Sequence, residues 1–294
     1  MPPLPRVFAY RDEGPMGPTR WQPRKTVCTQ TREHTDLPGV LHVVKFCQGQ
    51  IGAAAMISEV ICHELYRAGG MHVLDAVIVE ASEAFATGWN ETLGTGLIDG
   101  VPEPPIRIVA GSYFGTVYIS GVYDGPLASI EDVEKPEHLV LIWVFDCLVC
   151  NIDRAVRGNL ILMPWGKDRK FRLIAADHSD CFCGSTEFST GTWRELMIQR
   201  TRVGGVLVPE AIQASGGEDG LLLAIQTARY ALGGGLGEAF DHVPQEWWNF
   251  AHILPEQVEE TLWNRLDALP RLIDTGFWRG DRYGNLEGIP LIQL

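Results

Sequence analysis

The feature that most constrains the fold of this sequence is the segment 137–150, EHLVLIWVFDCLVC, which is apolar on nearly every side. A helix of this kind is buried all round, so the segment predicts a helix in the middle of a folded unit. Its uninterrupted apolar run, residues 139–145, ends at Asp146 and falls far short of the roughly 20 residues needed to cross a bilayer. We therefore expect a packed core and no membrane span.

A polar loop and a predicted hairpin follow this helix directly. The loop reads NIDRAVRGN over residues 151–159, and two apolar runs separated by a polar turn occupy residues 160–176. Such runs predict two antiparallel strands. An acidic turn begins where the second run ends. Asp153, Asn159 and Asp177 are therefore expected at one end of the same hairpin.

These residue types suit one kind of chemistry. Clustered carboxylate and carboxamide oxygens are ligands for Mg²⁺ that is bound together with substrate phosphates. Phosphoryl transfer needs an aspartate beside the acceptor, an aspartate and an asparagine on the metal, and a lysine on the phosphates. All four residue types occur in this chain in the order that the reaction requires.

The lysine of this set is Lys45, which lies within an apolar, β-branched segment, residues 40–46, that predicts a strand. A solvated lysine is unusual there, although an edge-strand lysine that extends past its apolar neighbours is the alternative. Glu59 lies in the helix predicted over residues 51–68, which ends at a Gly-Gly pair. It could form an ion pair with Lys45, or it could be an ordinary exposed helical glutamate.

Further elements are expected along the chain. Residues 1–38 are typical of loops or edge strands, and the tract LGGGLG over residues 232–237 follows a helix and is expected to be a flexible linker. Two strands, 106–110 and 116–120, are expected on either side of GSYFG, and a short helix within 82–105. The remaining predicted elements are strands over residues 76–81, 160–163 and 171–176, and helices over residues 192–202, 221–232, 245–253 and 255–269.

Composition argues against several partners. The 294 residues include 24 Lys and Arg against 37 Asp and Glu, a formal net charge of −13. A surface this acidic does not attract nucleic acid or an anionic membrane. Seven cysteines, an odd number in a chain of this length, favour buried reduced thiols, with a zinc site at Cys147, Cys150, Cys181 and Cys183 as the less favoured alternative. The N-terminal residues do not resemble a secretory signal, so a cytoplasmic location is expected.

The passage FDCLVCNIDRAVRGNLIL, followed by FRLIAADHSDCF, resembles the catalytic loop, hairpin and aspartate turn of HipA-like kinases and, more distantly, of type II phosphatidylinositol kinases. Upstream, HVVKF and MISEVICHEL are similar to the lysine strand and the glutamate helix of that fold. The resemblance covers most of residues 40–275. It implies an α+β, bilobal protein-kinase-like fold, with a β-rich N-lobe over residues 1–121 and a mainly helical C-lobe over residues 122–294.

The same resemblance implies a role for each residue that matches the family pattern. Lys45 would hold the α- and β-phosphates of ATP, with Glu59 orienting it. Asp153 would accept the proton of the acceptor hydroxyl as the catalytic base. Asn159 and Asp177 would bind Mg²⁺.

Other positions match the family less closely. Arg154, beside the catalytic base, would steady the loop or a phosphate, with a surface salt bridge as the alternative. Gly17 and Thr19, in DEGPMGPTR, are the best candidates for the loop that covers the phosphates. Asp180 is the alternative to Asp177 as a metal ligand. His178 resembles the family's Asp-His turn, or is a structural hydrogen-bonding histidine.

One spacing differs from the family. The metal-binding asparagine usually lies five residues after the catalytic aspartate, and here that position is Gly158, with Asn159 one residue further on. Either the loop is one residue longer or the second metal ligand is absent. Both interpretations remain open from the sequence.

The resemblance implies an ATP- and Mg²⁺-dependent kinase that transfers the γ-phosphoryl group to a hydroxyl, most simply a protein Ser or Thr. The alternatives are a lipid kinase, which the acidic surface disfavours, and a nucleotide-binding pseudokinase that acts as a regulatory module. The expected partners are a protein substrate and a neutralising or regulatory protein, with no direct contact to nucleic acid.

Overall fold

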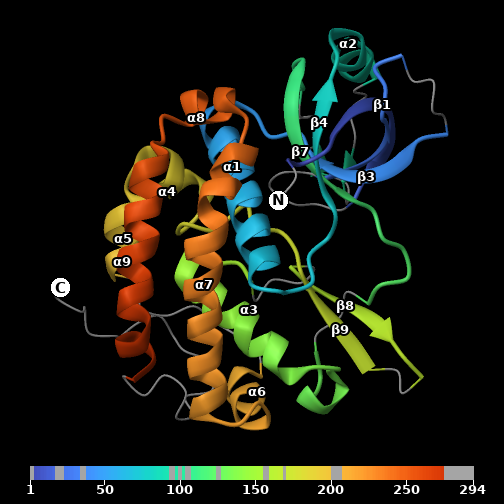
Figure 1. Ribbon diagram of the computed structural model, residues 1–294. Helices are drawn as coiled ribbons and strands as arrows, with labels where there is room; N and C mark the ends of the chain where they lie inside the picture. The colour runs from blue at the N-terminus through green and yellow to red at the C-terminus, as the bar shows by residue number, and fades with distance from the viewer. Residues whose placement is uncertain are drawn as a thin grey trace.

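The computed structural model describes residues 3–16, 23–33, 38–92, 97–98, 101–102, 107–123, 127–154, 159–167, 170–199 and 207–274. It is a mixed α+β fold in which a small barrel lies at one end and most of the helices at the other (Figure 1). The barrel closes in the order β1-β2-β3-β7-β4. Its strands are β1 (Arg6–Pro15), β2 (Arg24–Thr29), β3 (Val40–Lys45), β4 (Ala76–Ala81) and β7 (Gly111–Val117).

The barrel is closed by the one parallel pairing among these strands, in which Val7 of β1 lies opposite Val79 of β4. The other neighbours pair antiparallel. Helix α2 (Glu83–Thr92) follows β4, and the short strands β5 (Leu97–Ile98) and β6 (Val101–Pro102) pair with each other. Strand β3 is part of the barrel wall and ends at Lys45, which is buried beside the helices.

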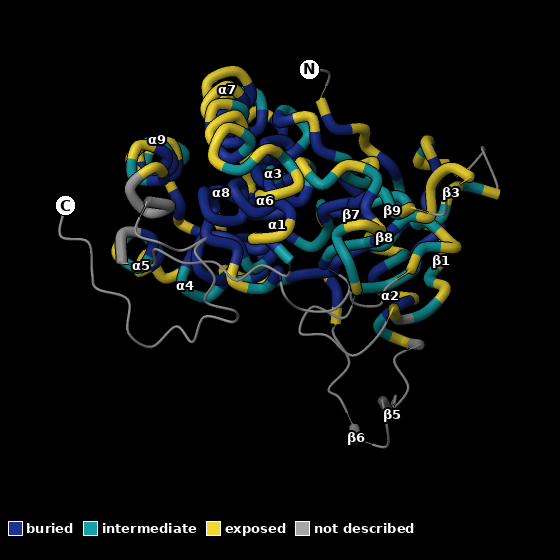
Figure 2. The backbone as a smooth tube through the Cα atoms, turned by 90° about the horizontal axis from the view of Figure 1, so that it is seen from below, coloured by how far each residue is buried: buried dark blue, intermediate teal, exposed yellow. Residues whose placement is uncertain are grey.

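Helix α1 (Gly49–Ala68) joins the two regions of the molecule. Every residue from 52 to 66 is buried, including the charged ones. The helix packs against α4, α7 and α8, and also contacts strand β7 of the barrel. Its central, buried position is visible as dark blue tube in Figure 2. Because it is enclosed on all sides, any polar side chain on α1 must find its partners within the protein.

Helix α3 (Pro136–Val149) is the apolar helix expected from the sequence, and it is preceded by a 3-10 turn, η1 (Ile130–Asp132). Its first residue is a proline, which fits the first turn of a helix. The helix ends at Cys150, whose φ of 50° turns the chain sharply away. Strands β8 (Leu160–Trp165) and β9 (Lys170–Ala175) then form the predicted hairpin.

After the hairpin, the described part of the chain forms six helices, which enclose α1 and α3 (Figure 1). Helix α7 packs against α1, α3 and α9, and its outer face is exposed in Figure 2. The six are α4 (Ser185–Thr190), α5 (Trp193–Gln199), α6 (Val208–Ala214), α7 (Glu218–His242), α8 (Gln245–Ala251) and α9 (Pro255–Asp274).

One sequence prediction is wrong in the barrel, at strand β7. Two strands were expected around GSYFG, but that segment is itself the strand β7, while residues 107–110 are irregular. The glycines suggested a turn. Gly115 instead lies within the sheet. A larger residue would not fit at this position, because a Cβ there would stand 2.8 Å from Val79 Cγ2. Close packing inside a narrow barrel, rather than a turn, accounts for this glycine.

The predicted linker over residues 232–237 is also wrong, since these residues continue helix α7. The reason is again close approach: a Cβ on Gly235 would lie 2.9 Å from the Cβ of Ala68 at the end of α1. Gly234 faces open space on the exposed side of the helix. Packing against α1 thus stabilises a helix that its glycine content disfavours.

The seven cysteines are buried and are not joined in disulfides. The thiols of Cys150 and Cys183 lie 3.2 Å apart where α3 ends. Within the ranges given above, no three histidine, cysteine or acidic side chains gather in a way that would hold a metal ion. Among the described helices, none combines the length and apolar character needed to span a membrane.

Two neighbouring glycines of α7, Gly234 and Gly235, give a matched pair of substitutions. Gly235→Ala should lower the free energy of unfolding by about 1–3 kcal/mol, because the new methyl group forces α1 and α7 apart. Gly234→Ala should raise it by about 0.5–1 kcal/mol, because it only restrains the unfolded chain and favours the helix. Urea denaturation of both variants measures the difference, and a Gly235→Ala protein as stable as Gly234→Ala would contradict this packing account.

Candidate functional site

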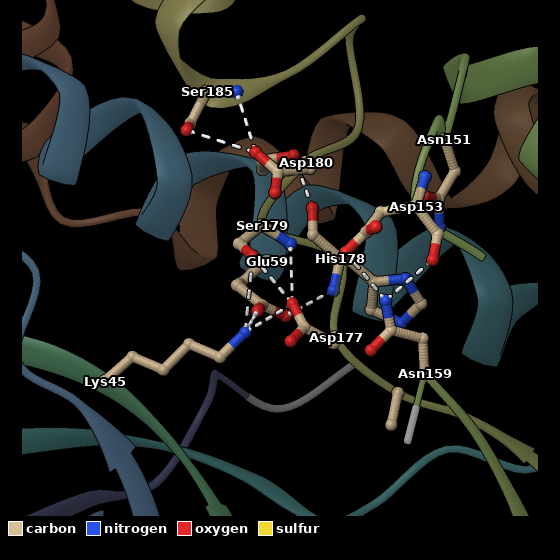
Figure 3. A network of polar contacts seen from close by, with 12 residues as sticks. Lys45, Glu59, Asn151, Asp153, Asn159, Asp177, His178, Ser179, Asp180 and Ser185 are labelled. Atoms are coloured by element: carbon tan, nitrogen blue, oxygen red, sulfur yellow. Dashed lines mark hydrogen bonds and ion pairs between the residues drawn. The ribbon is translucent and has the colours of Figure 1, made fainter. Parts of the chain in front are cut away.

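An ion cluster, buried at Lys45 and Glu59 and partly exposed at Asp177, lies where the barrel, helix α1 and the turn after β9 meet (Figure 3). The ammonium of Lys45, at the end of β3, donates hydrogen bonds to Glu59 Oε1 and to Asp177 Oδ1, the latter at 2.5 Å. It lies 3.4 Å from Ser179 Oγ. Lys45 and Glu59 are 8% and 2% exposed, so neither the edge-strand lysine nor the exposed helical glutamate is found.

The turn after β9 fixes both carboxylates. Asp177 adopts a φ of 53°, a backbone region that few residues other than glycine occupy. Its Oδ1 accepts a 2.6 Å hydrogen bond from Ser179 Oγ and a 3.4 Å one from the Ser179 amide. The amide of His178 donates to Glu59 Oε2 at 3.0 Å, and Ser58 Oγ donates to the His178 carbonyl at 2.7 Å. The turn is therefore tied to α1 at two points.

The charges in this cluster depend on one another. Burial disfavours the ammonium of Lys45, but the neighbouring carboxylates of Asp177 and Glu59 outweigh it and raise its pKa. The pKa of Asp177 is lowered because the attraction of Lys45 exceeds the effect of burial. Burial raises the pKa of Glu59, which has no access to water. The arrangement thus holds an ammonium that is charged and an Asp177 carboxylate that is ionised across the physiological range.

A second polar group lies at the open end of the hairpin. Asn159 precedes β8, and its carbonyl accepts a 3.2 Å hydrogen bond from the amide of Ala176, the residue before Asp177. Asn159 and Asp177 are therefore brought to the same end of the hairpin, as the sequence predicts. The Asn159 carboxamide donates to Asp153 Oδ2 at 2.9 Å and to the Asp153 carbonyl at 2.8 Å.

Asp153 is half-buried, and its pKa is raised, first by burial and then by the negative charges of Asp180 and Asp177. A carboxylate with a raised pKa is a stronger base than an exposed one. Its position is set by Asn151, whose Oδ1 accepts a 3.0 Å hydrogen bond from the Asp153 amide. The hairpin end thus combines the fixed carboxylate of Asp153 with an asparagine and a second aspartate.

Arg154 does not form the surface salt bridge considered as an alternative. It is 8% exposed, and its guanidinium bonds the buried carboxylate of Asp146, with the closest Nε contact at 3.0 Å. Burial disfavours its charge, but Asp146 outweighs this effect and raises its pKa. Asp180, the alternative metal ligand, accepts hydrogen bonds at 3.2 Å from both the amide and the hydroxyl of Ser185 at the start of α4.

Other predicted positions cannot be placed. Gly17 and Thr19 lie outside the described residues, as does Gly158 in the segment before β8. The sequence interpretation missed Ser179 and Asp146. The sequence does contain a feature that could have identified Asp146, since it is the one charged residue inside an otherwise apolar stretch. Nothing in the sequence distinguishes Ser179 except its place two residues after Asp177.

No family model matches the chain, and no curated protein matches it. Among solved structures, the fold is similar to that of a Helicobacter pylori proinflammatory kinase, CtkA, at 10% sequence identity and a TM-score of 0.48, with 94% of this chain and 99% of that chain covered.

His178 should make the stability of the protein depend on pH. Its pKa lies well below the usual value, first because it is buried and second because of the charge of Arg154. The unfolded chain binds a proton at this position below about pH 6.5 and the native state does not, so the free energy of unfolding falls as the pH drops from 7 to 5, by up to about 2 kcal/mol from this residue.

The variant His178→Phe keeps an aromatic ring against Tyr66, with which His178 packs at 4.6 Å between ring centroids. Urea denaturation at pH 7 and pH 5 should show a smaller loss of stability in this variant than in the wild type. An equal loss in both would mean that His178 is not held neutral in the folded protein.

Proposed function

We propose that this protein is a kinase that binds ATP with Mg²⁺ and transfers the γ-phosphoryl group to a hydroxyl, most simply on a protein Ser or Thr. The observation that supports the proposal is the buried Lys45–Glu59 ion pair, which meets Asp177 at the end of the hairpin that also holds Asp153 and Asn159. The proposal includes a bilobal division, with residues 1–121 forming the nucleotide-binding lobe and residues 122–294 the catalytic one.

The donor set fits Mg²⁺. Asp177 Oδ1 is already held by Lys45 and Ser179, so Oδ2 is the oxygen that it would offer to a metal. The Asn159 carboxamide uses its nitrogen on Asp153, which leaves its oxygen as the second donor. Two hard oxygen ligands, completed by phosphates and water, are what Mg²⁺ takes in such sites. The bound ion would neutralise charge that develops on the phosphates.

In this proposal, Lys45 holds the α- and β-phosphates while Glu59 keeps the ammonium in place. Asp153 accepts the proton of the acceptor hydroxyl, helped by the raised pKa that burial gives it. Asn159 orients the Asp153 carboxylate through its 2.9 Å hydrogen bond to Oδ2, as well as offering its oxygen to the metal. Gly17 and Thr19 remain the proposed phosphate-covering residues.

A second function has one observation in its favour. Lys45 contacts Asp177 directly at 2.5 Å, so the proposed phosphate-binding and metal-binding groups neutralise each other in the structure. A nucleotide-binding pseudokinase, acting as a regulatory module, would tolerate this contact because it does not need to open it for turnover. The lipid-kinase alternative has no such support, since the net charge of −13 disfavours an anionic membrane surface.

The proposed activity also has consequences for the cellular location of the protein and for its partners. ATP as the phosphoryl donor is consistent with a cytoplasmic location, and the hydroxyl acceptor with a protein substrate that the chain itself does not identify. A neutralising or regulatory protein partner is part of the same proposal.

Replacing the proposed base separates the two functions. Asp153→Asn should lower phosphoryl transfer by about 10²–10⁴-fold, the usual contribution of a general base, while leaving the dissociation constant for Mg-ADP within about threefold, because Asp153 is not among the proposed phosphate or metal ligands. Transfer from labelled ATP to the protein itself and to proteins of an extract gives the rate, and calorimetry gives the affinity.

The exposed Asp219, at the start of α7, provides the control. Asp219→Asn should leave both quantities unchanged. A wild type that binds Mg-ADP but transfers no phosphate to any acceptor would favour the pseudokinase, and a wild type that does not bind the nucleotide at all would refute both functions.

A further inference from the structure

A buried carboxylate lies beneath the site and has no part in the proposed chemistry. Asp146 belongs to the apolar helix α3 and is 1% exposed. It accepts hydrogen bonds from the hydroxyl of Tyr66, from Asn151 Nδ2 at 3.0 Å and from Arg154 Nε at 3.0 Å. A buried charge is costly unless it is paired and hydrogen-bonded, so a role that only this carboxylate can fill is worth seeking.

One line of contacts runs from Asp146 to the proposed base. The Asn151 carboxamide donates to Asp146 through Nδ2 and accepts the Asp153 amide through Oδ1, at 3.0 Å in both cases. The Asn151 amide also bonds the Asp146 carbonyl at 2.9 Å. Asn151 is 1% exposed. The backbone amide of the proposed base is thus tied to the buried helix through the Asn151 side chain.

A second line of contacts runs from Asp146 to the proposed metal ligands. Arg154 Nε and Nη2 bond Asp146, and Nη1 donates to the carbonyls of Asn159 and of Ala176, the latter at 2.6 Å. The first carbonyl belongs to one proposed ligand, and the second immediately precedes the other, Asp177. Nη2 also lies 3.3 Å from His178 Nδ1. All three nitrogens of Arg154 therefore contact protein groups.

We propose that Asp146 is a positioning residue that sets the distance between the base and the metal ligands of the proposed phosphoryl transfer. It acts through Asn151 on Asp153 and through Arg154 on Asn159 and Asp177. Arg154 is accordingly a second positioning residue and not a phosphate contact. The inference rests on the proposed function, because the distance matters only if a phosphoryl group is transferred between these groups.

Asp146 would affect the reaction rate by keeping the proposed catalytic groups in the correct positions. Catalytic groups must be held within roughly 0.5 Å of their productive geometry, and a displacement of about 1 Å lowers the rate by about 10²-fold. The phosphate contact of Lys45 is fixed separately, by Glu59 and the end of β3. Loss of Asp146 should therefore affect the rate of transfer far more than the binding of the nucleotide.

The experiment compares Asp146→Asn with Tyr66→Phe. Asp146→Asn replaces the buried carboxylate itself by a neutral carboxamide. Tyr66→Phe removes one hydrogen-bond donor to that carboxylate but leaves the contacts through Asn151 and Arg154 intact. For Asp146→Asn we expect kcat to fall by about 10²-fold, with the KM for ATP and the dissociation constant for Mg-ADP changed by about threefold or less. For Tyr66→Phe we expect kcat within about threefold of the wild type, whatever the loss in melting temperature.

If Asp146→Asn does not fold, Arg154→Lys serves in its place. It keeps the charge pair with Asp146, but a single ammonium cannot bond Asp146 and both carbonyls in the geometry of the guanidinium. The same separation between kcat and KM is expected. A folded Asp146→Asn or Arg154→Lys protein with wild-type kcat would overturn the proposal, as would a Tyr66→Phe protein that loses as much activity as Asp146→Asn.

These outcomes are distinct from failure of the proposed function. A wild type that transfers no phosphate would refute that function, and the positioning role would fall with it. A wild type that is active, together with substitutions that leave kcat unchanged, would refute the positioning role alone.

Discussion

The structure depends on one buried ammonium group. Lys45 lies between Glu59 and Asp177, and these three residues come from the barrel, from α1 and from the turn after β9. An ammonium out of contact with water is tolerable only when carboxylates surround it. The strand β3 must therefore end beside α1, and the hairpin must return to the same point. Three parts of the chain are fixed relative to one another by this requirement.

Much of this arrangement could be predicted from local sequence patterns. The all-apolar segment around Asp146 and the Pro-free run before Gly69 identify α3 and α1, because burial and helix propensity act over neighbouring residues. The hairpin and the clustering of Asn159 with Asp177 followed from the same kind of pattern. Lys45 could be singled out because a charged residue interrupts an apolar strand.

The remaining features depend on contacts between distant segments. Gly115 and Gly235 suggested a turn and a linker, but each accommodates a close neighbour, Val79 in the barrel and Ala68 on α1, that the sequence does not reveal. The burial of Arg154 likewise follows from Asp146, which becomes its partner only when α3 and the loop after it fold back on each other. No local pattern encodes these approaches.

The protein interior tolerates many polar groups because charged side chains are paired there and hydrogen-bonded. Around α1 and α3, three charge pairs are buried or partly buried: Lys45 faces Glu59, Arg154 faces Asp146, and Glu64 contacts Arg67. Pairing limits the cost of burial, and hydrogen bonds from backbone amides and from Ser, Tyr and Asn side chains to the carboxylates reduce it further. A network of this kind specifies one geometry, which the proposed phosphoryl transfer would need.

The most direct test of the central claim is a crystal structure with Mg²⁺ and a non-hydrolysable ATP analogue. The account predicts an ion bound by Asp177 Oδ2 and the Asn159 carboxamide oxygen at roughly 2.0–2.1 Å, with the Lys45 ammonium on a phosphate oxygen and still paired with Glu59. The account would be contradicted by a nucleotide bound elsewhere. An ion held by Asp177 with Asn159 turned away would equally contradict it.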